Sequence, residues 1–137
     1  RHGEPAFRAA ETAALDRVLA DNNLIVALGG GGPPAPGAAA LLRAARAAGR
    51  VRLIYLRGLS ATLRARLAAS DLAHRPSLTG DDPLTEIDRV FAARDPLYSA
   101  LADRVITTDD RTPDDLLAEL LAAARQLSSG AGFQPAE

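Results

Sequence analysis

An apolar run that ends in four glycines constrains the fold of this chain more than any other feature. Residues 24–28 read Leu-Ile-Val-Ala-Leu, and residues 29–32 are all glycine. A short run rich in β-branched residues is typical of a buried strand in a parallel sheet. Glycines at its carboxyl end let the backbone turn tightly and let a ligand approach, or they form only a flexible turn. Because open α/β sheets bind ligands at that end of their strands, we expect a ligand site here.

The rest of the chain alternates between helical and extended patterns. We expect strands at 24–28, 51–56 and 104–108, and helices at 5–21, 37–48, 61–69, 83–93 and 113–127. Gly49 fits a helix C-cap, Ser60 and Thr112 fit N-caps, and Pro96 is expected to break a helix before a short one that ends near residue 102. The alternation predicts an α/β fold with parallel strands.

Composition excludes several kinds of site. The 16 basic residues other than histidine are all arginine, so the chain cannot supply the phosphate-binding lysine of a P-loop. With no cysteine, neither a disulfide nor a thiolate metal site is possible. The net charge of -1 gives no reason to expect nucleic acid as a partner. No apolar run approaches the ~20 residues of a membrane span, and no leader pattern is present, so we expect no membrane partner and a cytoplasmic location.

Three arginines stand near the glycines in distinctive local sequences. Arg8 follows Gly-Glu-Pro-Ala-Phe, Arg75 precedes a proline in a polar segment, and Arg94 begins Arg-Asp-Pro-Leu-Tyr. Arginine can hold a carboxylate or a phosphate through two parallel hydrogen bonds. Each arginine alone also fits a solvated surface position. Their order around a glycine-rich strand end favours an anion-binding site.

In these motifs the sequence resembles the shikimate kinases, small P-loop kinases related in fold to the nucleoside monophosphate kinases. The family patterns are Gly-Glu-x-x-Phe-Arg-x-x-Glu, Gly-Gly-Gly, an Arg-Pro-Leu-type lid, Arg-x-Pro-Leu-Tyr, and a late strand end followed by Thr-Pro and two acids. They match residues 3–11, 29–31, 75–78, 94–98 and 107–115. The likeness runs from residue 3 to about 125. Ser77, Gly32 and Thr107 depart from the pattern without removing a charged group.

The resemblance implies the transfer of the ATP γ-phosphoryl group to the 3-hydroxyl of shikimate, with Mg²⁺ and with shikimate and ATP as partners. Arg8 and Arg94 would hold the shikimate carboxylate and ring hydroxyls, and Glu11 would orient Arg8. The site would be closed by the backbone of three residues, Gly29, Gly30 and Gly31.

The resemblance also assigns the nucleotide side. Arg75, on a lid at residues 71–82, would be catalytic and would neutralise the transferring phosphoryl group of ATP. Arg66 and Arg111 would flank the adenine. The kinase-like domain would cover residues 1–127, and residues 128–137 would form a flexible tail.

The fold implied is a three-layer αβα parallel sheet that is incomplete here. The family begins with a strand, the P-loop, a helix and a second strand, and this chain matches only the part of the family after that second strand. The first missing strand would lie between residues 24–28 and 51–56, and the Mg²⁺ ligands would lie in the missing segment, with no metal site in this chain. We therefore expect the chain alone to be inactive and poorly stable, and the complete protein to be a monomer.

Two alternatives remain open from the sequence. One is a degenerate kinase-like module that binds a hydroxy-carboxylate without catalysis. The other is a related small-metabolite kinase, such as a gluconate kinase, against which the Phe-Arg-x-x-Glu and Arg-x-Pro-Leu-Tyr motifs argue.

Overall fold

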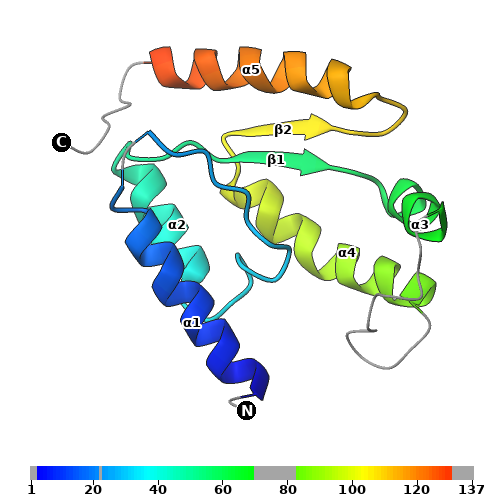
Figure 1. Cartoon of the computed structure of the whole chain (residues 1–137), viewed down its shortest axis with the longest axis horizontal. Coiled ribbons are helices and arrows are strands. Elements are labelled where there is room, and N and C mark those ends of the chain that lie inside the picture. Colours follow the sequence, from blue (N-terminus) through cyan, green and yellow to red (C-terminus); the bar gives the residue numbers. More distant parts are fainter. Residues whose placement is uncertain (1–2, 22, 70–82, 131–137) are drawn as a thin grey trace.

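A computed structural model describes residues 3–21, 23–69 and 83–130. They form helices, a small parallel sheet and the segments that connect them (Figure 1). Strands β1 and β2 pair in parallel, with Ile54 opposite Arg104 and Arg57 opposite Thr107. This confirms the predicted α/β class and the parallel pairing. The elements in chain order are α1 (Gly3–Val18), α2 (Ala38–Ala47), β1 (Ile54–Arg57), α3 (Ser60–Ala69), α4 (Pro83–Leu101), β2 (Arg104–Thr107) and α5 (Pro113–Ser129).

The two strands lie between helices. Figure 1 shows α5 along one side of the strands and α4 along the other, and these helices contact β2 and β1 respectively. Helices α1 and α2 pack together, and α2 also contacts α4. Their apolar faces, with Ala35 from the turn before α2, form the main core: Leu15, Ala35, Ala38, Leu42 and Leu101. A parallel pair covered by helices places the carboxyl ends of both strands at one edge.

Local signals account for two helix ends. Gly49 has φ +71°, and its N–H donates to the carbonyl of Arg46 at 3.0 Å, which closes α2 as predicted. At the start of α5, the Thr112 side chain accepts from the N–H of Asp115, and the Asp115 carboxylate accepts in return from the N–H of Thr112. Both caps satisfy backbone groups that the helix leaves without partners.

The predicted strand at residues 24–28 is wrong for the described structure. These residues belong to neither a helix nor a sheet, and Ile25 is 101% exposed. A strand requires a hydrogen-bonded neighbour, and no described segment pairs with this one. An apolar segment without a neighbouring strand stays in contact with solvent. The missing partner, rather than the local sequence, explains this error.

The predicted break at Pro96 is also wrong, because α4 continues through it to Leu101. Proline removes one helical hydrogen bond, at a cost of roughly 3 kcal/mol in a helix interior. Contacts on both sides of Pro96 offset this cost: Asp95 bonds β1 residues, and Leu97 packs against the core that contains Leu101.

Smaller differences concern element ends. Helix α5 continues to Ser129, so residues 128–129 belong to it and not to the predicted tail, and residues 131–137 lie outside the described part. The predicted lid at 71–82 lies outside the described residues as well. Within residues 3–21, 23–69 and 83–130, no helix is long and apolar enough to cross a membrane.

Candidate active site

The carboxyl ends of the two strands are joined by hydrogen bonds. The N–H of Thr108 donates to the carbonyl of Arg57 at 2.8 Å, and the N–H of Leu59 donates to Oδ1 of Asp109 at 3.0 Å. A hydrogen bond from the Thr62 hydroxyl and, next, the bond from Leu59 lower the pKa of Asp109, so this carboxylate remains charged. Hydrogen bonds therefore join the segments that follow β1 and β2. Two groups of predicted site residues lie near this edge of the sheet.

Arg8 occupies the glycine side of the site. Its Nη1 donates to Glu11 at 2.6 Å, one helical turn along α1, and its Nη2 contacts the exposed Glu4 at 3.2 Å. The hydrogen bond to Glu11 raises the pKa of Arg8, so the guanidinium stays charged. A Cβ placed on Gly31 would lie 2.7 Å from Cζ of Arg8, which is closer than real side chains approach. The glycine is therefore needed for Arg8 to lie where it does.

Arg94 lies against the preceding glycine. A Cβ on Gly30 would lie 3.4 Å from Nη1 of Arg94, and the Tyr98 hydroxyl donates a short hydrogen bond to the carbonyl of Gly30. A Cβ on Gly29 would lie 4.0 Å from Oε1 of Glu11. The structure therefore brings together all five residues predicted to bind the acceptor, Arg8, Gly29, Gly30, Gly31 and Arg94.

A second group of predicted site residues lines a cavity of about 410 Å³, whose walls come from the end of β1, α3, the segment after β2 and the start of α5. Both predicted adenine neighbours, Arg66 and Arg111, line it. Apolar residues provide much of the remaining wall: Leu56, Leu63, Pro113 and Leu116. A largely apolar cavity with a few polar groups is the usual form of a binding site for a small organic molecule.

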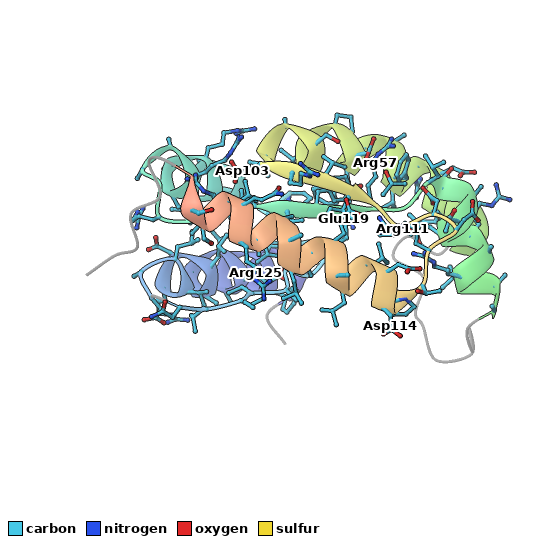
Figure 2. The ribbon with its side chains drawn as sticks, turned by 90° about the horizontal axis from the view of Figure 1, so that it is seen from above. Arg57, Asp103, Arg111, Asp114, Glu119 and Arg125 are labelled. Atoms are coloured by element: carbon cyan, nitrogen blue, oxygen red, sulfur yellow. The ribbon has the colours of Figure 1, made fainter. Side chains whose placement is uncertain are left out.

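The two arginines of the cavity are held by their neighbours. Arg66 donates to the hydroxyl and the carbonyl of Thr108 at 3.1 and 2.6 Å. Arg111 forms an ion pair with Glu119 of α5, and Figure 2 shows these two side chains beside each other along that helix. Arg75, predicted to be catalytic, lies outside the described residues.

Sequence reasoning did not assign a role to several residues beside the glycines. Tyr98 is part of the Arg-x-Pro-Leu-Tyr motif, which could have indicated its contact with Gly30. Arg57, Asp95 and Tyr55 form a cluster next to it. Only the position of Arg57 at the end of a strand hinted at this cluster, because its partner is 38 residues away in the chain.

The described residues offer little to a metal ion. Among residues 3–21, 23–69 and 83–130, no three histidine, cysteine, aspartate or glutamate side chains are grouped so that they could hold one. Kinases usually bind Mg²⁺ through one or two carboxylates together with water and the substrate phosphates. None of the described residues is assigned a role as a Mg²⁺ ligand.

Comparison with known proteins places this arrangement in a family. The family model for shikimate kinase matches residues 1–125. The chain belongs to the shikimate kinase family. It is 36% identical over 127 residues to a shikimate kinase of Pseudomonas savastanoi pv. phaseolicola, a match that covers 93% of this chain and 70% of the relative. It is also 36% identical over 125 residues to a Pseudomonas aeruginosa shikimate kinase, covering 91% of this chain and 69% of the relative.

A relative from another genus supports the same family assignment. A shikimate kinase of Symbiobacterium thermophilum is 36% identical over 119 residues, which is 87% of this chain and 66% of the relative. The chain thus spans roughly two thirds of the length of the shikimate kinases that it matches. These matches favour shikimate kinase over the gluconate kinase alternative.

Proposed function

We propose that this chain carries the acceptor-binding and adenine-binding parts of a shikimate kinase. The enzyme transfers the γ-phosphoryl group of ATP to the 3-hydroxyl of shikimate. The observation that supports this most directly is the position of two arginines at consecutive glycines, Arg94 at Gly30 and Arg8 at Gly31. Two guanidinium groups beside a side-chain-free backbone are suited to a small ring that bears a carboxylate and hydroxyls.

The contacts of Arg8 leave room for a substrate carboxylate. Glu11 holds Nη1 at 2.6 Å, whereas Glu4 contacts Nη2 at 3.2 Å and its side chain is 74% exposed. An exposed ion pair contributes only about 0–1 kcal/mol, so a substrate carboxylate can replace Glu4 at little cost. Arg94 then holds the same carboxylate or a ring hydroxyl. The backbone of Gly29, Gly30 and Gly31 lies close to the ring because no side chain intervenes.

The cavity beside β1 and β2 is the proposed adenine site. The guanidinium groups of Arg66 and Arg111 flank a flat base, and Leu63 and Pro113 provide apolar contacts. Phosphoryl transfer depends on positioning and on neutralising charge. Arg75, which lies outside the described residues, is proposed to supply positive charge to the transferring group, as the resemblance to the family implies.

The phosphate cradle is proposed to lie in a segment outside these 137 residues. The chain has no lysine, and its described residues have no grouped ligands for Mg²⁺. Bound Mg²⁺ would neutralise phosphate charge. The proposed first strand of that segment would pair between β1 and residues 24–28, which are exposed and without a partner strand in the described structure. A monomeric complete enzyme and a cytoplasmic location stay predictions.

Isothermal titration calorimetry with shikimate tests the acceptor site. Arg94→Ala removes a charged hydrogen-bond donor, a loss of about 1.5–3 kcal/mol, so binding should weaken by tenfold or more. Arg64→Ala is the matched control, because Arg64 is about half exposed, pairs with Asp88 on α4 and lies on α3. Binding that survives Arg94→Ala, or that falls equally in both variants, would contradict the assignment.

A coupled assay for ADP release separates a catalyst from a binding module. The chain alone should not turn over ATP with shikimate, because it has no P-loop lysine. Turnover by the 137-residue chain would refute the proposal that an outside segment is needed. If shikimate binds but no turnover occurs when that segment is supplied from a matched Pseudomonas shikimate kinase, the degenerate binding module is the better description.

A further inference from the structure

A cluster of polar and aromatic side chains joins the end of β1 to the middle of α4. Nε of Arg57 donates to Oδ1 of Asp95 at 2.7 Å, and Nη2 donates to Oδ2 at 2.9 Å. This bidentate geometry is the strongest form of an arginine–carboxylate pair. The Tyr55 hydroxyl donates to the same Oδ1 at 3.1 Å. We call Arg57, Asp95 and Tyr55 the β1–α4 clamp.

The clamp meets α4 at the turn that contains Pro96. Pro96 follows Asp95 directly and has no N–H, so the helix lacks one backbone hydrogen bond at this turn. Arg57 contacts α4 at a second point, because its Cζ lies 5.4 Å from the centre of the Phe91 ring. These two contacts lie one turn apart and bracket Arg94 in the sequence. Side chains from β1 therefore support the turn that carries the substrate-binding arginine.

The clamp also reaches the glycines through an aromatic contact. The rings of Tyr55 and Tyr98 meet edge to face, with centroids 5.3 Å apart. Tyr98 in turn donates its hydroxyl hydrogen to the carbonyl of Gly30, where Arg94 lies. The position of Arg94 relative to Gly30 is thus supported from Asp95 on one side and from Tyr98 on the other.

We propose that Arg57 is a positioning residue for shikimate binding, acting through Asp95 to hold Arg94 against Gly30. This rests on the proposed function, since it assumes that Arg94 binds shikimate. Arg57 itself does not touch the substrate. Its effect comes from geometry: a substrate-binding group that is displaced by about 1 Å can cost a large factor in rate or binding.

Calorimetry with shikimate on the 137-residue chain tests the proposal. Arg57→Ala should weaken shikimate binding by about tenfold, and Arg57→Lys, which keeps the charge but loses the two-point fork, should give an intermediate loss. Rescue by the lysine shows that binding follows the contact to Asp95. Far-UV circular dichroism and thermal unfolding of each variant check that the fold is retained.

Arg46→Ala is the matched control. Arg46 and Asp103 form a pair of the same length, 2.7 Å, with side chains 37% and 12% exposed, against 31% and 18% for Arg57 and Asp95. Asp103 precedes β2 and so lies at the opposite end of the strands from Arg57, as Figure 2 shows. This variant should lose similar stability but bind shikimate as the unmodified chain does. An equal loss of affinity in Arg46→Ala would mean that Arg57 acts only through stability.

A double-mutant cycle tests the route through Asp95. In an Asp95→Ala background, Arg57→Ala should cause a much smaller loss of affinity, because only the contact of Arg57 with the Phe91 ring remains. If the losses of shikimate affinity in the two single variants add up in the double variant, Arg57 does not act through Asp95. If the unmodified chain binds shikimate and Arg57→Ala binds equally well, the inference fails while the proposed function stands. If the unmodified chain takes no shikimate, the proposed function fails, and the inference fails with it.

Discussion

Gly31→Ala should separate substrate binding from folding. The added Cβ would meet Cζ and Nη2 of Arg8 at 2.7 and 2.8 Å, while the backbone of Gly31 lies outside the left-handed region and accepts alanine. The arginine tip is flexible and moves away, so the folding cost is the loss of the partly buried hydrogen bond to Glu11, about 1 kcal/mol. Losing the charged hydrogen bonds of Arg8 to shikimate costs about 1.5–3 kcal/mol. Calorimetry should therefore show affinity reduced about ten- to hundredfold.

Gly130→Ala is the matched control for this substitution. Gly130 caps the end of α5, away from the acceptor site, and a Cβ there would lie 3.7 Å from the carbonyl oxygens of Gln126 and Leu127, an ordinary contact, so shikimate affinity should stay within about twofold of that of the unmodified chain. Thermal unfolding of both variants should be close to that of the parent. If Gly31→Ala binds shikimate normally, Arg8 is not held where the substrate needs it. If both variants lose affinity equally, a general loss of folded protein is responsible rather than Arg8.

Two further predictions concern tyrosine ionisation and helix capping. Burial and, next, the hydrogen bond to Asp95 raise the pKa of Tyr55 to about 12, so near-ultraviolet absorbance should show a phenolate titrating near that pH, and Tyr55→Phe should remove it. Because the folded state holds this proton more tightly, stability should fall as the pH rises from about 10 towards 12; a Tyr55 midpoint near 10 would contradict this. Thr112→Ala should lower the free energy of unfolding in urea by about 1 kcal/mol, while Thr112→Ser keeps the cap; equal stability of the two would show that the bond to Asp115 contributes nothing.

Features with local causes could be predicted from the sequence. Helix α2 ends where Gly49 adopts a positive φ, and helix α5 begins at the Thr112 cap, because each signal acts within a few residues. The Arg8–Glu11 pair agrees with helical spacing alone. The meeting of Arg8 and Arg94 at the glycine-rich turn could be predicted only through the resemblance to the family, because the two arginines lie far apart in the chain.

Features that depend on distant partners could not be predicted. Residues 24–28 have the composition of a strand, but a sheet position also requires a neighbour, which the described residues do not provide. The continuity of α4 through Pro96 depends on contacts with β1 and with the core. The clamp itself joins Arg57 to a carboxylate 38 residues away. No local pattern encodes such a pairing.

The exposed run at residues 24–28 has a practical consequence for the chain in solution. Its five residues are apolar, uncharged and free of proline, and Leu24, Ile25, Val26 and Leu28 are all at least 41% exposed. Short segments of this kind with unpaired backbone groups are templates for intermolecular cross-β stacking. The same residues that lack a neighbouring strand thus make the isolated chain prone to aggregate at high concentration. A charged residue in place of Ile25 would act as a gatekeeper and keep preparations dispersed.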